Sequence, residues 1–231
     1  MGRQVIRTKN FVNDAANFVL DEAHNALGAR NEFRIALSGG NTPAPIYSRL
    51  AVIGHDLPWE LTRITFGDER CVPPDDPRSN YRMARDTLLL PAAIPEQSIL
   101  RMRGEIDPQI AAQEYQDQLD LMAVQSGQPI YRHDLVLRGL GDDAHTASLF
   151  PGTAALDETT RRVVANFVPK LDAWRLTFTI PLINHARQIC FLVGAGKDSR
   201  LIQRVMEGDP QLPASRVNPP AGNVTWIIQE T

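Results

Sequence analysis

The stretch DLVLRGLGDDAHTASLFPG, residues 134–152, carries an interior strand directly into a glycine-rich turn with charged side chains. Residues 134–137 have the apolar character of a buried strand, and the turn after them contains Asp142, Asp143 and His145. Polar groups that follow the carboxyl end of a strand lie where open α/β sheets place their ligand sites. Because the unperturbed pKa of histidine lies near neutrality, His145 is a candidate for proton transfer.

Strands and helices alternate on both sides of this stretch. Apolar spacing predicts helices at 13–27, 42–52, 80–90, 109–123 and 197–206, and further strands at 33–37, 64–66, 163–168, 175–180, 188–193 and 224–228. The alternation predicts a mostly parallel, Rossmann-like sheet with helices on both faces, which is a three-layer α/β/α architecture. Because the 231 residues contain no internal repeat and no long linker, we expect one domain over residues 1–231.

The composition of the chain argues against several classes of binding partner. The formal net charge is −3, so no basic excess is present for nucleic acid or a membrane surface, and we expect neither as a partner. No apolar run approaches the roughly 20 residues that span a bilayer, and the first residues lack the apolar core of a secretory signal. Cys71 and Cys190 lie far apart and in no metal or redox spacing. We therefore expect a cytoplasmic protein without a metal site.

A second strand-to-helix junction contains Ser38, Gly39, Gly40 and Thr42. Two glycines let the backbone approach a ligand closely, and the following helix directs its positive end at the same place. Hydroxyl and backbone N–H donors of this kind suit a phosphate monoester. The spacing fits neither a Rossmann fingerprint nor a Walker loop, and a tight turn without a ligand explains the same residues equally well.

Two more junctions carry charged side chains. Lys197 stands at the predicted start of a helix, where a cation is unfavourable unless an anion shares the site, although a solvated surface lysine is the alternative. Asp68 and Arg70 follow the strand at 64–66 and would share one face of a continued strand. They could orient substrate hydroxyls and an oxyanion, or form a structural ion pair. The segment Ser79–Tyr81 is typical of a helix N-cap.

His145 differs from the other four histidines because carboxylates and a threonine surround it. An adjacent carboxylate would fix its tautomer, and a helix beginning there would help to keep the imidazole neutral. No serine or cysteine lies in a nucleophile-elbow motif, so we expect the histidine to activate water. We expect a structural or solvated role for His24, His55, His133 and His185.

These junctions, in this order, resemble the 6-phosphogluconolactonase family. The matching segments are 38–43, 68–73 with 79–81, and 143–151, and similarity continues through 175–177, 181–184, 196–197 and 212–217. The resemblance implies the glucosamine-6-phosphate deaminase/6-phosphogluconolactonase fold, a sugar-phosphate lactone as substrate and no required cofactor. The implied reaction converts 6-phospho-D-glucono-1,5-lactone to 6-phosphogluconate, the second step of the oxidative pentose phosphate pathway.

The resemblance also implies roles for individual residues. His145 matches the general base, and Asp68 and Arg70 match the turn that orients substrate. The phosphate-side positions are Ser38, Gly39, Gly40, Thr42 and Lys197. The first of these loops is shared with the deaminases, so a sugar-phosphate deaminase or isomerase is the main alternative, and a non-enzymatic sugar-phosphate sensor is another. The oligomeric state stays open between a monomer and a weak dimer.

Two residues depart from the family pattern. Arg138 replaces an apolar residue, and we expect it to pair with Asp142 or Asp143 or to face the site, since a buried unpaired arginine is costly. Ala144 replaces a glycine, and it would be strained if the backbone needs a positive φ there.

Overall fold

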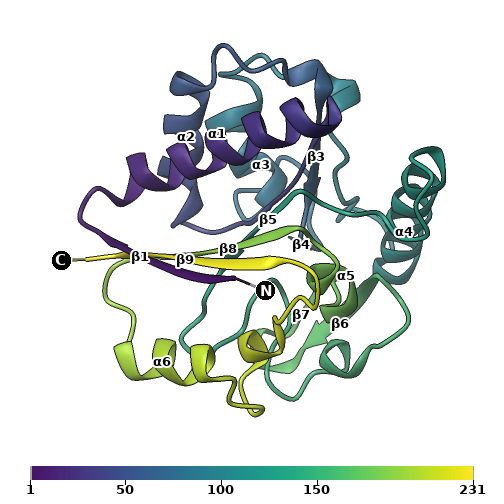
Figure 1. Ribbon diagram of the computed structural model, residues 1–231. Helices are drawn as coiled ribbons and strands as arrows, with labels where there is room; N and C mark the ends of the chain where they lie inside the picture. Colours follow the sequence, from purple (N-terminus) through teal and green to yellow (C-terminus); the bar gives the residue numbers. More distant parts are fainter. Residues whose placement is uncertain (1, 231) are drawn as a thin grey trace.

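A six-stranded sheet in the order β1-β9-β8-β5-β2-β3 forms the centre of the computed structural model, which describes residues 2–230 (Figure 1). Every neighbouring pair in this sheet is parallel. The strands are β1 (Arg3–Thr8), β2 (Phe33–Leu37), β3 (Thr62–Phe66), β5 (Leu135–Gly139), β8 (Gln188–Val193) and β9 (Asn223–Gln229). The parallel sheet predicted from the alternation of strands and helices is confirmed.

Helices cover both faces of this sheet, as Figure 1 shows for α1 to α3 on one side and α6 on the other. Leu135 and Leu137 pack with α1 and α2, whereas Val136 between them packs with the opposite cluster. Apolar residues on both faces of a strand are typical of parallel sheets between helix layers. The helices are α1 (Phe11–Arg30), α2 (Pro43–Ile53), α3 (Asn80–Ala84), α4 (Pro108–Gln125), α5 (Ile180–Asn184) and α6 (Ser199–Glu207).

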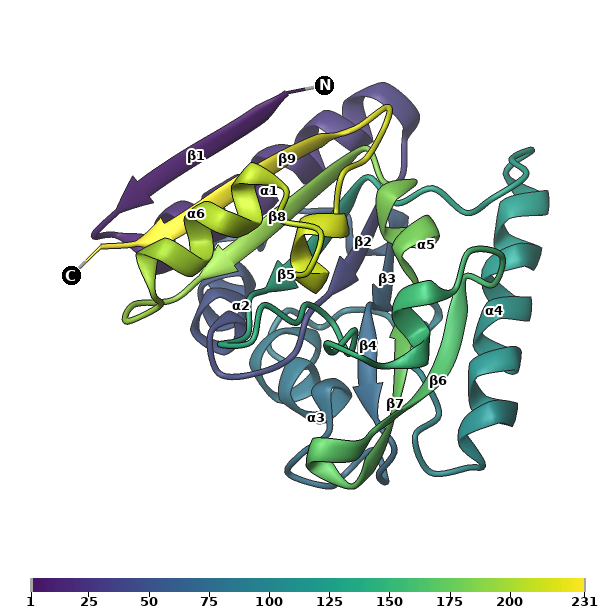
Figure 2. The ribbon, with the colours of Figure 1, turned by 90° about the horizontal axis from the view of Figure 1, so that it is seen from below.

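A second, antiparallel sheet, in the order β4-β7-β6, was not predicted from the sequence. It consists of β4 (Asp68–Arg70), β7 (Ala173–Phe178) and β6 (Val163–Val168). The residues of β6 and most of β7 were predicted as strands, but the sequence did not indicate that they form a sheet of their own. Figure 2 shows this small sheet beside the central one, with α4 along β6. The second sheet places Arg70 opposite Arg175.

Several predicted elements have different bounds. The predicted helix at 80–90 is divided, because α3 ends at Ala84 and a π-helical turn follows over Arg85–Leu89. Helix α6 begins after Lys197, since the side chain of Asp198 accepts the N–H of Arg200 and caps it. No helix begins at His145, which lies in a turn. Short 3₁₀ helices occupy Trp59–Leu61, Glu96–Ser98, Ala154–Asp157, Pro169–Leu171 and Pro213–Arg216.

The edge strand β1 was missed by the sequence analysis because its side chains are mostly exposed and show no apolar pattern. It pairs with β9 alone, at the margin of the sheet. Among the described residues, no helix is both long enough and apolar enough to cross a bilayer.

Candidate active site

A cavity of about 370 Å³ lies at the carboxyl ends of the central strands. Loops that follow β2, β5 and β8 line it together with residues of the second sheet. It contains every residue that the sequence analysis assigned to a site, which are Ser38, Gly39, Gly40, Thr42, Asp68, Arg70, His145 and Lys197. The folded chain therefore brings together four segments that are far apart in the sequence.

His145 is held by a carboxylate and by an aromatic ring. Its Nδ1 lies 2.5 Å from Oδ1 of Asp143, and the same oxygen accepts the backbone N–H of His145 at 3.1 Å. The imidazole stacks on Phe150 with 4.1 Å between ring centroids. A proton on Nδ1 that is donated to Asp143 leaves Nε2 of a neutral ring free to accept a proton. The expected carboxylate partner of His145 is therefore Asp143.

The charge state of Asp143 depends on opposing effects. Burial acts to raise the pKa of this carboxyl, but hydrogen bonds from Lys170 and His145 outweigh it and hold the pKa at about 2. Lys170 also lies over Phe150, with its Nζ 4.6 Å from the ring centroid. Asp143 therefore remains an ionised acceptor at neutral pH.

The turn before His145 is built tightly around the imidazole. A Cβ at Gly141 would lie 2.0 Å from Nδ1 of His145, so only glycine leaves room for the ring. Ala144 has a φ of 60°, which is the positive value considered in the sequence analysis. Left-handed backbone costs an alanine about 1–2 kcal/mol. Its side chain is fully buried in the core, and this burial offsets part of the strain.

The loop after β2 is held in place by Tyr47 and lines the cavity. The Tyr47 hydroxyl accepts the N–H of Ser38 and donates to its carbonyl oxygen, both at 2.9 Å. Ser38 Oγ is buried without a hydrogen-bond partner among residues 2–230. Gly40 has a φ of 94°, and a Cβ at Gly39 would lie 1.7 Å from Oδ1 of Asn80. Because α2 begins directly after this loop, its N-terminus is available for an anion.

Neighbouring residues of the strand Asp68–Arg70 have different roles: Asp68 lines the cavity, and Glu69 makes structural hydrogen bonds. Oδ2 of Asp68 accepts the Ser148 hydroxyl at 2.8 Å, and Asp68 lines the cavity. Glu69 instead accepts the backbone N–H groups of Arg70, Asn80 and Tyr81 and the hydroxyl of Ser79. Burial raises the pKa of Glu69. Ser79 also caps α3, as the sequence predicts.

Cations line the cavity from two sheets. Lys197 Nζ lies 2.6 Å from Oδ1 of the exposed Asp142. Arg70 donates to the carbonyl oxygen of Arg78 and lies beside Arg175. Burial and the charge of Arg70 lower the pKa of Arg175. Arg175 and Lys170 were not predicted as site residues from the sequence, although Arg175 begins one of the segments that carry the family resemblance.

Arg138 is not paired as the sequence analysis expects. It contacts neither Asp142 nor Asp143 through a hydrogen bond, and all three of its guanidinium nitrogens lack a partner among residues 2–230. The side chain is fully buried against Gly67, where a Cβ would lie 1.9 Å from Nη2, and its Cζ is 5.7 Å from the Phe178 centroid. Burial lowers the pKa of Arg138 to about 10, opposed by the charge of Asp68. The residue therefore lies behind the cavity wall.

Of the residues that line this cavity, His145 alone is a histidine. His133 is fully buried, with Nε2 2.9 Å from the hydroxyl oxygen of Thr65. Within residues 2–230 no group of three or more His, Cys, Asp or Glu side chains is arranged to hold a metal ion.

Comparison with known proteins gives consistent results. A model of the family described as "Glucosamine-6-phosphate isomerases/6-phosphogluconolactonase" matches residues 7–226. The chain is 43% identical over 210 residues to the 6-phosphogluconolactonase of Synechocystis sp., covering 89% of this chain and 85% of that protein. It is 33% identical over 209 residues to human 6-phosphogluconolactonase, covering 88% and 80%. The structure of 6-phosphogluconolactonase from Trypanosoma cruzi superposes with a TM-score of 0.86 at 31% identity, covering 99% and 96%.

Proposed function

Because this chain belongs to the family of glucosamine-6-phosphate isomerases and 6-phosphogluconolactonases, we propose that it hydrolyses 6-phospho-D-glucono-1,5-lactone to 6-phospho-D-gluconate. This is the second step of the oxidative pentose phosphate pathway. One observation carries the proposal: His145, whose Nδ1 is bonded to Asp143, lines the same cavity as the glycine-rich loop that contains Ser38, Gly39 and Gly40. A phosphorylated ester needs both an anchor for phosphate and a base for water.

The phosphate is anchored by the Ser38–Gly40 loop, the hydroxyl of Thr42 and the cation of Lys197. These groups offer backbone N–H donors, the positive end of α2 and a point charge. Anchoring the phosphate away from the reacting carbon lets binding energy orient the lactone. Asp68, which lines the cavity, accepts substrate hydroxyls.

Nε2 of His145 removes a proton from a water molecule as the water oxygen attacks C1 of the lactone. Asp143 holds the ring in the required tautomer and stabilises the imidazolium that forms. The guanidinium of Arg70 donates to the developing oxyanion on C1. When the bond between C1 and the ring oxygen breaks, His145 returns the proton to that oxygen, and the product is a carboxylic acid that ionises.

Replacement of His145 tests the assignment directly. We expect His145→Gln and His145→Ala to lower kcat about 10²–10⁴-fold, because the base is lost while the phosphate anchor remains, and KM should change little. Lactone hydrolysis is followed at pH 6 to 7, where spontaneous hydrolysis is slow. His55→Gln is the matched control, because His55 is exposed and does not line the cavity. Unchanged turnover in the His145 variants would refute the proposal.

A second assay separates the two activities that the family name contains. We expect no ammonia release from glucosamine 6-phosphate at enzyme concentrations that hydrolyse the lactone rapidly. Ammonia release without lactone hydrolysis would assign the chain to the isomerase branch. Tight ligand binding without either reaction would favour a sensor.

A further inference from the structure

A second cavity, of about 160 Å³, lies at the opposite edge of the central sheet from the candidate active site. It is formed where α1 ends and where β2, β5 and β8 begin. Strands of five residues are about 16 Å long, so the two cavities are separated by the length of the strands. The lining residues are Arg30, Glu32, Arg34, Gln128, Arg132, Asp134 and Arg187.

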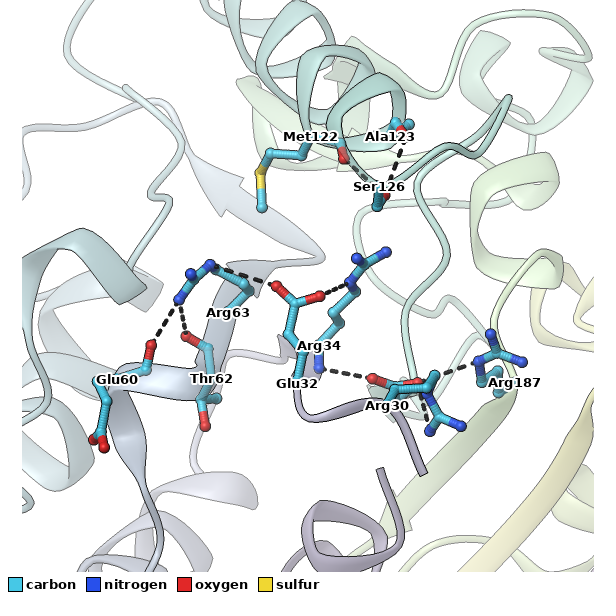
Figure 3. Close-up of polar contacts among 11 residues, drawn as sticks. Arg30, Glu32, Arg34, Glu60, Thr62, Arg63, Met122, Ala123, Ser126 and Arg187 are labelled. Carbon is cyan, nitrogen blue, oxygen red and sulfur yellow. Dashed lines mark hydrogen bonds and ion pairs between the residues drawn. The ribbon is translucent and has the colours of Figure 1, made fainter. Parts of the chain in front are cut away.

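The two carboxylates of this cavity are already fully engaged. Asp134 is 4% exposed, and its Oδ1 lies 2.9 Å from Nη2 of Arg30 and 3.2 Å from Nε of Arg187. Its other oxygen accepts the backbone N–H of Arg34 at 2.9 Å. Glu32 accepts Nε of Arg34 at 2.5 Å. Figure 3 shows Glu32 between Arg34 and Arg63, with Arg30 and Arg187 close to each other.

Positive charge remains in excess after these pairings. Four guanidinium groups and two carboxylates line the cavity, so four minus two leaves a net charge of +2. Arg132 donates to the carbonyl oxygens of His185 and Ala221, which fixes its position without neutralising it. Burial, with the charges of Arg132 and Arg30, lowers the pKa of Arg187. The arginines therefore repel one another at close range.

One acceptor in the cavity also lacks a partner. The side-chain oxygen Oε1 of Gln128 is buried and makes no hydrogen bond to any residue in the range 2–230. A buried polar atom without a partner costs about 1–3 kcal/mol. A ligand that carries both anionic oxygens and a hydroxyl hydrogen would satisfy the guanidinium groups and this amide oxygen together.

We propose that this cavity binds a small, hydrogen-bearing oxyanion of the phosphate class, a site additional to the proposed active site. Unprotonated oxygens accept from Arg132 and Arg187, as guanidinium groups favour bidentate contacts to phosphate. The P–OH group donates to Gln128. The cavity has less than half the volume of the candidate active site, which suits a phosphate-sized ion rather than a sugar phosphate. The bound ion joins α1 to the starts of three strands and stabilises the folded chain.

Thermal unfolding in inorganic phosphate tests this proposal. A ligand that binds only the folded state raises Tm as its concentration exceeds Kd. Because phosphate could also enter the active site, the measurement is made in the Lys197→Ala background, against sodium chloride of equal ionic strength. We expect phosphate to raise Tm in this background. No rise beyond that in sodium chloride would overturn the proposal.

Variants at the cavity identify where the phosphate binds. We expect Arg187→Gln to weaken phosphate binding about tenfold or more, the effect of one charge-assisted hydrogen bond, and Arg187→Lys to restore part of it. Arg63→Gln is the matched control, because Arg63 pairs with Glu32 but does not line the cavity. Equal loss in both variants, or no loss in Arg187→Gln, would overturn the assignment. Retained lactone hydrolysis, measured with Lys197 intact, shows that Arg187→Gln folds.

Gln128→Met gives a test that disturbs no ion pair. Sulfate carries no hydrogen at neutral pH and cannot donate to the amide of Gln128. Calorimetric titration should therefore show tighter binding of phosphate than of sulfate, and Gln128→Met should remove that preference. Equal affinities for the two ions before the substitution would contradict a site for a hydrogen-bearing oxyanion.

Discussion

Arg138 places a full positive charge inside the central sheet. Its side chain is completely buried, its nitrogens have no hydrogen-bond partner among the described residues, and Asp68 is the nearby opposing charge. Transfer of an ion from water into such surroundings costs several kcal/mol even after relaxation. The desolvation cost of this charge therefore lowers the stability of the folded chain.

We expect Arg138→Met to raise the free energy of unfolding by about 1–4 kcal/mol, because a flexible apolar side chain fills the space without a desolvated charge. Urea denaturation at pH 7 measures the change. Arg138→Ala is the control, since it removes the charge but leaves a cavity and should gain less. A loss of stability in Arg138→Met would show that the guanidinium is satisfied in the folded protein.

At the level of elements, the sequence predicts the bounds of interior strands better than it predicts which strands pair with each other. The bounds at 33–37, 163–168 and 188–193 agree with β2, β6 and β8. An alternating or continuous apolar pattern reports burial, and burial does not distinguish a parallel neighbour from an antiparallel one. For this reason β6 was found but its sheet was not. The start of α6 was misplaced by two residues because a capping aspartate decides it, and apolar spacing does not.

A substitution in the turn after β5 tests whether the orientation of His145 matters for the proposed reaction. We expect Gly141→Ala to lower kcat at least about 10²-fold, because the new Cβ would lie 2.0 Å from Nδ1 and turn the ring away from Asp143. The inhibition constant of inorganic phosphate, measured in the same assay, should stay close to that of the parent. A parallel loss of phosphate binding would mean that the substitution disrupts the whole cavity.

For the whole molecule, parallel topology predicts much of the candidate site. Ser38, His145 and Lys197 follow three strands that run in the same direction, so their convergence follows from the strand order. Lys170 and Arg175 enter the cavity from or beside the second sheet, whose packing depends on contacts between distant segments. Apolar spacing and charge pattern therefore did not assign them, and only the family resemblance pointed to the segment that begins with Arg175. The same topology gathers the starts of β2, β5 and β8 into the arginine-lined cavity, where the sequence shows only scattered charges.

The stability of the whole chain should depend on His133. This histidine is fully buried between Tyr131 and Phe178, and burial, reinforced by the charges of Arg138 and Arg34, lowers its pKa to about 3 from an ordinary value of 6.5. Between these two pH values His133 is protonated in the unfolded chain but not in the folded chain. The free energy of unfolding should therefore fall as the pH falls from about 6.5 toward 3, by up to about 1.4 kcal/mol per pH unit.

Urea denaturation at intervals from pH 7 to pH 4 measures this slope, and His133→Gln is the comparison because its amide can still bond to Thr65 without titrating. We expect the variant to be less stable at pH 7 and to lose less on acidification. Asp143 acts mainly below this range, because its stabilising effect is lost between its ordinary pKa of 3.8 in the unfolded chain and about 2 in the folded chain. Curves that fall in parallel for the two proteins would assign acid sensitivity to other groups.

Arg138→Met should also reduce the loss of stability on acidification, because removing the neighbouring cation lets His133 of the folded chain accept its proton at a higher pH.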